Sequence, residues 1–133
     1  METRYGDLEV TLTGNVATAE IQRPPNNFFD TDLICSIADA FEALDKENDC
    51  RAIVLAAQGK HFCAGNDLGE FATMTPENGT ERMWRVREAF FAISNCAVPV
   101  IGAVQLQPSF ESTMKAKPSV RWYSRYSRQK VCS

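Results

Sequence analysis

Histidine is almost missing from this chain, because it occurs only once, as His61, in 133 residues. A metal site built from several histidines is therefore excluded. The five cysteines are scattered, odd in number and never spaced as a C-x-x-C pair. This usage predicts reduced thiols, with neither a disulfide framework nor a zinc site. We expect no metal and no tightly bound cofactor.

Long apolar runs are missing as well. No stretch approaches the roughly 20 residues that cross a bilayer. The polar, acidic start over residues 1–7 has none of the features of a secretory signal. Hydrophobic residues make up 44% and charged residues 23% of the chain, a balance typical of globular proteins. The sequence predicts one cytoplasmic domain with a single core and no membrane partner.

Glycine does not occur after Gly102, and the charge changes near the same point. Residues 1–105 contain 16 acidic and 8 basic residues, whereas residues 106–133 contain 1 acidic and 6 basic residues. Such a break often marks a tail or a change of origin. We therefore predict a domain over residues 1–105 and an irregular, disordered basic tail over residues 106–133. A shifted reading frame, an alternative exon or a truncated gene would each produce such a tail.

The amino-terminal segment predicts a β-hairpin followed by a helix. Residues 8–13 and 16–21 have strand character around Gly14-Asn15, which supplies turn residues. Two prolines within residues 23–27 then exclude regular structure. A helix capped by Asp30 or Thr31 is expected to reach about Lys46. Its apolar face contains Leu33, Ile34, Ile37, Phe41 and Leu44.

The next segment alternates strands with a helix. Residues 52–57 form a short apolar run typical of a strand that is buried on both faces. A loop-rich stretch follows from residue 60 to about residue 79, and a second apolar strand is expected over residues 98–104. This alternation predicts an α/β architecture with parallel strands joined by crossovers. Between the two strands, a helix is expected over residues 80–95. Its apolar residues are expected to be buried, some only partly: Met83, Trp84, Val86, Phe90, Phe91 and Ile93.

The loop over residues 60–68 directly follows a predicted buried strand, where ligand sites of α/β proteins lie. Ala64 and Gly65 are small enough for a ligand to approach the backbone. If Asp67 opens a helical turn, the amides of Asn66 and Asp67 point outward unpaired and can hold an oxyanion or a phosphate. A glycine-containing turn with Asp67 as a helix cap explains the same residues equally well.

Three segments resemble the crotonase (enoyl-CoA hydratase/isomerase) superfamily. Residues 62–68, Phe-Cys-Ala-Gly-Asn-Asp-Leu, resemble its F-x-A-G-x-D-[LI] motif. Residues 23–28 resemble the R-P-x-x-N-[AF] turn that leads into its first helix, and residues 97–105 resemble the strand before its glycine-rich loop. The match covers about residues 5–105 in one order and spacing. It implies an incomplete crotonase-like (ClpP/crotonase) α/β fold of repeated ββα units, with an irregular carboxy-terminal tail.

The resemblance also implies a chemistry. The family binds an acyl-CoA thioester as substrate and stabilises an enolate-like oxygen between two backbone amides. The first of these amides would belong to Asn66, which follows Ala-Gly. For Phe28, and for Phe29 beside it, packing in the core is at least as good an explanation as ligand contact. By position, contacts with CoA or the acyl group would come from Phe28, Ala64, Asp67, Leu68 and Gly69.

The sequence departs from the family pattern after Gln105. The family's next loop is rich in glycine and supplies the second amide, but residues 106–111 contain no glycine. Removing one such donor typically costs about 10²–10³-fold in rate. No pair of carboxylates matches the family's catalytic acid and base, and the region that forms family trimers or hexamers is not recognisable. We expect impaired hydratase/isomerase activity; the alternatives are a non-catalytic CoA-binding or interaction fragment, or the product of a broken gene.

Three further features receive less weight. Aromatic residues alternate with arginines over residues 121–128, a pattern that can bind nucleic acid, but a change of origin explains it better and no nucleic-acid partner is expected. His61 fits a solvent-facing loop better than a catalytic base. Cys63 has no neighbouring base in the sequence, so packing is the better interpretation than nucleophilic chemistry.

Overall fold

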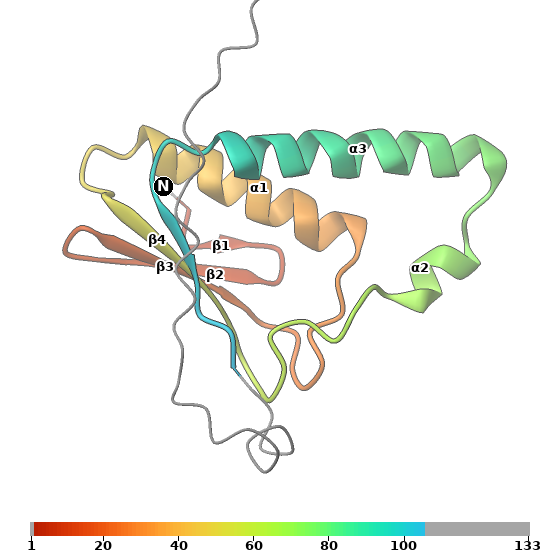
Figure 1. The fold of residues 1–133 in the computed structure, drawn as a ribbon, viewed down its shortest axis with the longest axis horizontal. Coiled ribbons are helices and arrows are strands. Elements are labelled where there is room, and N and C mark those ends of the chain that lie inside the picture. Colours follow the sequence, from red (N-terminus) through yellow and green to blue (C-terminus); the bar gives the residue numbers. More distant parts are fainter. Residues whose placement is uncertain (1, 106–133) are drawn as a thin grey trace, which may run out of the picture.

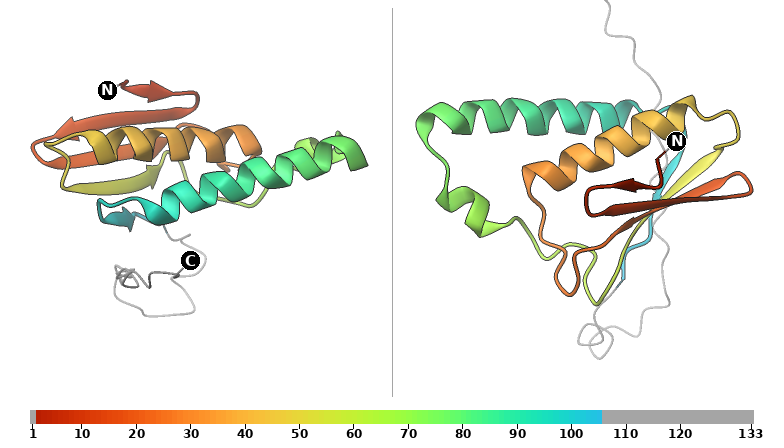
Figure 2. Two further views of the ribbon diagram at one scale, coloured as in Figure 1. Left: turned by 90° about the horizontal axis from the view of Figure 1, so that it is seen from above. Right: turned by 180° about the vertical axis from the view of Figure 1, so that it is seen from behind.

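The computed structural model describes residues 2–105, which form a five-stranded sheet with helices on one side (Figure 1). Helix α1 lies against the sheet, and α3 packs alongside α1 (Figure 2). The predicted tail over residues 106–133 lies outside the described residues. The elements are β1 (Arg4–Tyr5), β2 (Leu8–Thr13), β3 (Val16–Ile21), α1 (Thr31–Lys46), β4 (Ala52–Ala57), α2 (Leu68–Ala72), α3 (Pro76–Asn95) and β5 (Val100–Gly102).

The strands are hydrogen-bonded in chain order, from β1 to β5. The pairs β1–β2 and β2–β3 are antiparallel, whereas β3–β4 and β4–β5 are parallel. The predicted hairpin and the predicted parallel crossovers are therefore both present, with β3 belonging to each. The short strand β1 was not predicted. Because β3 and β4 are parallel, the segments that follow them leave the same edge of the sheet.

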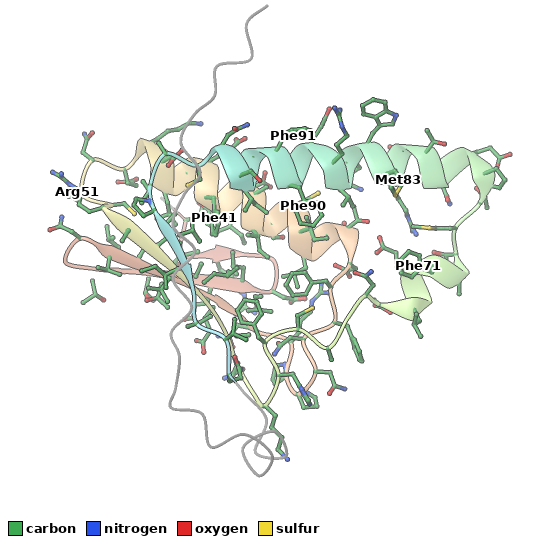
Figure 3. All side chains as sticks on the ribbon, viewed as in Figure 1. Phe41, Arg51, Phe71, Met83, Phe90 and Phe91 are labelled. Carbon is green, nitrogen blue, oxygen red and sulfur yellow. The ribbon has the colours of Figure 1, made fainter. Side chains whose placement is uncertain are left out.

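The hairpin and α1 supply most of the core. Side chains alternate between buried and more exposed along β2 and β3, as the sequence pattern predicts. Asp30 caps α1, because its side chain accepts a hydrogen bond from the Leu33 amide. Phe41 is fully buried on α1 (Figure 3), and burying a side chain of this size stabilises the fold by roughly 1.5–3 kcal/mol. The five predicted apolar positions of α1 are all buried: Leu33, Ile34, Ile37, Phe41 and Leu44.

Helix α3 differs from its prediction in both start and burial. It begins at Pro76 because Thr75 caps it in a reciprocal capping box with Asn78. The prediction that this helix buries its large apolar residues is wrong for four of them. Only a narrow stripe of α3 touches α1, and Ala89 is its buried residue. Val86 and Ile93 are partly buried, whereas 52–67% of the surface is exposed in Met83, Trp84, Phe90 and Phe91.

The two carboxy-terminal strands also depart from the prediction. In β4 only Ile53 is fully buried. The prediction that this strand is buried on both faces is therefore wrong for the described residues. The reason is that α1 contacts β1, β2 and β3, and no helix of residues 2–105 packs over β4 to a comparable extent. Strand β5 is shorter than the predicted 98–104 and covers Val100–Gly102.

The turn from α3 into β5 is held by Asp45, near the end of α1. The Asp45 carboxylate accepts hydrogen bonds from the amides of Ala97, at 2.8 Å, and Val98, at 3.0 Å. The buried Cys96 thiol also donates to it, at 3.1 Å. Burial and this carboxylate together raise the pKa of Cys96 to about 12. The neutral thiol is therefore the form that the fold requires.

Replacing Asp30 with alanine should lower the free energy of unfolding by about 1–2 kcal/mol, because the cap of α1 and the ion pair of Asp30 with Arg23 are lost. Urea unfolding followed by circular dichroism measures this change. Asp39→Ala is the matched control, since Asp39 is exposed on the same helix and should change stability by no more than about 0.5 kcal/mol. Equal effects of the two substitutions would contradict the assignment of Asp30 as the cap.

The raised pKa of Cys96 predicts a stability that depends on pH. Below the ordinary thiol pKa of 9.0, folded and unfolded chains both hold the proton. Between that value and about 12, only the folded chain keeps it, so the free energy of unfolding should fall as the pH rises. Cys96→Ala removes this contribution. The stability difference between wild type and Cys96→Ala should therefore shrink from about pH 8 to about pH 10.5; a constant difference would contradict the prediction.

Candidate functional site

The loop after β4 lies beside the segment that enters α1 and pairs with it like a short strand. Phe29 and Asn66 form an isolated parallel bridge. The Phe29 amide donates to the Gly65 carbonyl at 2.9 Å, and the Asp67 amide donates to the Phe29 carbonyl at 2.8 Å. One step earlier, the Ala64 amide donates to the Asn26 carbonyl at 3.0 Å. The loop that carries the Ala-Gly motif is thus fixed by its backbone.

This pairing determines where the Asn66 amide points. The Gly65 carbonyl and the Asp67 amide, on either side of Asn66, both bond to Phe29. Because successive amides of an extended segment point to opposite sides, the Asn66 N–H points away from Phe29. Within residues 2–105, no acceptor is hydrogen-bonded to the Asn66 amide, and the residue is exposed. Gly65 has a φ of +123°, a conformation that is open to glycine and strained for other residues.

The expectation for Asp67 is wrong in one respect. Its amide does not point outward unpaired, because it donates to the Phe29 carbonyl. The side chain instead caps α2, accepting a hydrogen bond from the Gly69 amide at 2.8 Å. The helix-cap explanation therefore describes Asp67. Of the two amides that were expected to point outward, only that of Asn66 has no acceptor within residues 2–105.

The other residues that were predicted to contact CoA lie near the Asn66 amide, and most of them are exposed. Ala64 and Gly69 are exposed on either side of it, and Leu68 is 78% exposed at the start of α2. Phe28 is 43% exposed, so core packing does not account for it, whereas Phe29 packs partly buried against the core. The contact roles of these residues with CoA remain predictions.

Asn27 holds the two loops together, a role that the sequence interpretation missed. It is fully buried and has a φ of +50°. Its side-chain oxygen accepts from the Arg23 amide at 3.0 Å, and its Nδ2 donates to the carbonyls of Gln58, at 2.7 Å, and His61. The signal was present, because Asn27 is the asparagine of the R-P-x-x-N turn, but only its neighbours were considered for ligand contact.

Arg23 stiffens the same turn from outside. Its guanidinium lies 2.7 Å from the Asp7 carboxylate and 3.0 Å from that of Asp30, and it donates to the Phe28 carbonyl at 3.2 Å. Burial lowers the pKa of Arg23, but the two carboxylates outweigh burial and leave the pKa above its ordinary value. Arg23 therefore keeps its charge and joins the turn between β1 and β2, the turn before α1, and Asp30, which caps α1.

A cavity of about 250 Å³ lies beside Asn66, between the loop, the start of α1, and helices α2 and α3. Figure 3 shows Phe71 on α2 and Met83 and Phe90 on α3, which contribute to its wall. Most of the lining is apolar. The polar exceptions, apart from Asn66 itself, are Asp30, Thr31, Glu70 and Arg82.

Glu70 and Arg82 connect the elements around this cavity. Both carboxylate oxygens of Glu70 accept from the Thr31 amide, at 3.1 and 3.2 Å. Arg82 donates to the Glu70 carbonyl at 2.8 Å and to the Thr73 hydroxyl at 3.3 Å, and its Nε lies 3.9 Å from the Glu70 carboxylate. The sequence interpretation did not single out Glu70, although Glu70 lies in the first turn of the helix that Asp67 caps, close to the motif.

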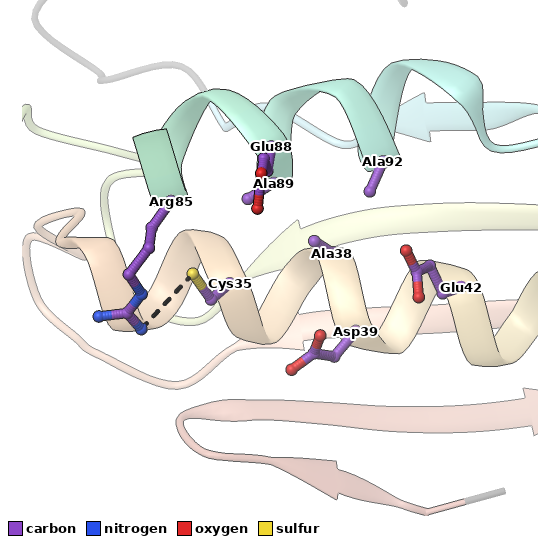
Figure 4. A pocket seen from close by; sticks show the side chains of 8 residues that line it. All are labelled: Cys35, Ala38, Asp39, Glu42, Arg85, Glu88, Ala89 and Ala92. Atoms are coloured by element: carbon purple, nitrogen blue, oxygen red, sulfur yellow. Dashed lines mark hydrogen bonds between the residues drawn. The ribbon is translucent and has the colours of Figure 1, made fainter. Parts of the chain in front are cut away.

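A second cavity of about 250 Å³ lies between α1 and α3, away from the loop (Figure 4). Arg85 reaches to within 3.9 Å of the Cys35 sulfur there, and Asp39, Glu42 and Glu88 add carboxylates to its lining. Over residues 2–105, no group of three or more histidine, cysteine, aspartate or glutamate side chains is placed to hold a metal ion. None of the helices in that range is long and apolar enough to cross a membrane.

The ββα arrangement and the outward amide after Ala-Gly define this chain as an α/β protein of the crotonase type. The sequence model described as "Enoyl-CoA hydratase/isomerase" matches residues 11–106. The chain therefore belongs to the enoyl-CoA hydratase/isomerase family. This confirms the resemblance that was predicted from three segments.

Individual relatives agree with this placement. The chain is 28% identical over 102 residues to the "Probable enoyl-CoA hydratase EchA14" of Mycobacterium tuberculosis, covering 76% of this chain and 40% of the relative. It is 30% identical over 97 residues to a peroxisomal Delta(3,5)-Delta(2,4)-dienoyl-CoA isomerase of Arabidopsis thaliana, covering 63% and 35%. The chain thus spans well under half the length of these relatives.

Solved structures confirm the fold. An enoyl-CoA hydratase from Shewanella pealeana superposes with a TM-score of 0.70 at 27% identity, covering 77% of this chain and 40% of that one. Pseudomonas aeruginosa DspI superposes with a TM-score of 0.69 at 33% identity, covering 75% and 38%. The predicted crotonase-like α/β fold is confirmed, and the match covers the same share of the relatives as the sequence match does.

Asn27→Ala should destabilise the fold by about 2–4 kcal/mol, because the three hydrogen bonds of this buried side chain are lost. Chemical denaturation measures the loss. Asn95→Ala is the control, since Asn95 is exposed at the end of α3 and should change stability by less than about 0.5 kcal/mol. An Asn27→Ala protein as stable as this control would show that the loops are held by other contacts.

Proposed function

We propose that this chain binds an acyl-CoA thioester and stabilises the enolate-like form of its carbonyl oxygen at the amide of Asn66. The observation that carries the proposal is this outward amide, which has no partner in residues 2–105. A backbone donor fixed in advance stabilises a developing oxyanion without the cost of reorganising at the moment of reaction. Family membership supports acyl-CoA as the substrate class.

The cavity beside Asn66 supports the placement of the acyl group. Its walls are mostly apolar, as a hydrocarbon chain requires. Its apolar walls come partly from Phe71 and Met83, on two different helices. The CoA portion would then run over the exposed residues on the other side of the amide, with Phe28 and Leu68 offering apolar surface.

We further propose that hydration by this chain is slow. An oxyanion site of this family uses two amides, and the sequence after Gly102 contains no glycine that would let a second backbone segment approach the thioester. Hydration also needs a positioned acid and base. A non-catalytic acyl-CoA binder is the second candidate function, and the lack of a recognisable carboxylate pair favours it. Binding of crotonyl-CoA without formation of the hydrated product would select this second candidate.

The cytoplasm is our proposed location. Cys35, Cys50 and Cys63 are free thiols in the structure, which suits a reducing compartment. Some relatives are named as peroxisomal or mitochondrial proteins, so location differs among the proteins that this chain resembles.

Removing the Asn66 amide tests the proposed oxyanion donor. Asn66→Pro eliminates the N–H, whereas Asn66→Ala keeps it, so only the proline variant should weaken binding of butyryl-CoA. A matched ligand sharpens the test: butyl-CoA, a thioether, lacks the carbonyl oxygen. Wild type should prefer the thioester by about fivefold or more, and Asn66→Pro should lose this preference. Calorimetric titration gives both affinities, and circular dichroism confirms that each variant is folded.

Equal affinities of wild type for the thioester and the thioether would contradict the assignment of the amide. Loss of the preference in Asn66→Ala would contradict it too, because that variant retains the backbone donor. Absence of any binding of either ligand to folded wild type would overturn acyl-CoA binding itself.

A further inference from the structure

We propose that Glu70 is a catalytic base of this site, which removes and returns a proton at C2 of the bound acyl group. The inference rests on the proposed function, because it places the thioester oxygen at the Asn66 amide. It goes beyond that function by naming a proton-transfer residue within the described part of the chain. The reaction that follows is exchange of the C2 proton, which needs one carboxylate and no second acid.

Position is the first argument. Asn66 and Glu70 line the same cavity, and both follow from the local fold of one short segment. Asn66 ends the extended part of the loop, Asp67 caps α2, and Glu70 comes one turn later. In the proposed placement, a thioester whose oxygen meets the Asn66 amide and whose acyl chain enters the cavity brings C2 to a cavity that Glu70 also lines. A base has to be within reach of the proton that it removes.

The availability of the carboxylate is the second argument. Two carboxylates line the cavity, those of Asp30 and Glu70. Asp30 uses one oxygen to cap α1 at the Leu33 amide and the other in its 3.0 Å ion pair with Arg23. Glu70 shares one hydrogen-bond donor, the Thr31 amide, between both of its oxygens, and its ion pair with Arg82 Nε is long, at 3.9 Å. A carboxylate can accept about four hydrogen bonds, so Glu70 retains positions at which a proton can bind.

Orientation is the third argument. The Glu70 side chain is only 18% exposed. Its oxygens are aligned by the Thr31 amide, and its backbone is held by Arg82 through the 2.8 Å bond to the Glu70 carbonyl. The side chain is therefore fixed from α1 and the backbone from α3. A base that is held in place before the substrate arrives contributes more to the rate than a mobile one.

The proton balance closes without a co-reactant. The C2–H bond breaks, the proton moves to a Glu70 oxygen, and the electron pair of that bond forms the C1–C2 double bond of the enolate. The negative charge then lies on the thioester oxygen at the Asn66 amide. Return of a proton from Glu70 to C2 regenerates the thioester. In heavy water, exchange of the carboxylic proton with solvent places deuterium at C2.

A purely structural role is the competing explanation, since Glu70 also joins α1 to α2. Glu70→Gln separates the two roles. The amide oxygen of glutamine still accepts from the Thr31 amide, so the structural contact survives, but the side chain no longer takes up a proton near neutral pH. Glu81→Gln is the matched control, because Glu81 is an exposed carboxylate on α3.

The experiment follows deuterium incorporation at C2 of butyryl-CoA by mass spectrometry in heavy water, with the full chain. Wild type and Glu81→Gln should exchange at the same rate. Glu70→Gln should exchange about 10²–10⁴-fold more slowly, with its affinity for butyryl-CoA and its unfolding midpoint close to those of wild type. Glu70→Asp keeps the carboxylate but shortens its reach, so its rate should fall at least tenfold below wild type.

An unchanged exchange rate in Glu70→Gln would overturn the proposal. Should that variant not fold, Glu70→Asp decides instead, and a wild-type rate in this second variant would overturn it. Wild type that binds butyryl-CoA but shows no exchange would refute the role of Glu70 and leave acyl-CoA binding intact. Wild type that does not bind butyryl-CoA would refute both.

Discussion

The buried side chain of Asn27 is the constraint on which the rest of the site depends. One amide group bonds to three backbone atoms that come from two loops at the same edge of the sheet. Because the Asn27 side chain is fully buried, water cannot replace any of these hydrogen bonds unless the core opens. The turn before α1 and the loop after β4 therefore keep one relative position. The bridge between Phe29 and Asn66 forms within that arrangement.

The outward amide follows from this bridge by simple geometry. Where two extended segments pair, every second N–H is used, and the intervening one is left for another acceptor. Gly65 allows the chain to reach this arrangement at a φ of +123°. The oxyanion donor that we propose is thus placed by the direction of the backbone and not by the side chain of Asn66. This explains how asparagine can occupy a position at which the family motif leaves the residue open.

Much of the fold could be predicted because its elements are coded locally. The hairpin over β2 and β3 follows from the alternation of side chains, and α1 follows from its cap and its regularly spaced apolar residues. The motif around Ala64 and Gly65 was located for the same reason, since small residues after an apolar run are visible in the sequence. Family membership, inferred from three such segments, is shown by the match over residues 11–106.

The rest depended on contacts between distant segments. The burial expected for Met83 and Phe90 failed because apolar residues at helical spacing do not reveal how wide the contact with α1 is. The pairing of the Asp67 amide with Phe29 joins residues 38 positions apart, and a local pattern does not encode it. The Thr31–Glu70 contact has the same character. Sequence reasoning therefore found the loop but not the partners that orient it.

The exposed side of α3 has a consequence for spectroscopy. Trp84 is the tryptophan of the described residues, and more than half of its surface is exposed. The Arg87 guanidinium lies 5.0 Å from its ring centre and 4.8 Å from that of Phe91. Emission from Trp84 would therefore respond to the solvent and to the Arg87 guanidinium near α3. It would not report a change in the packing of Phe41 against the sheet. A fluorescence signal from this residue reports on the helix surface, and the core has to be followed through the backbone.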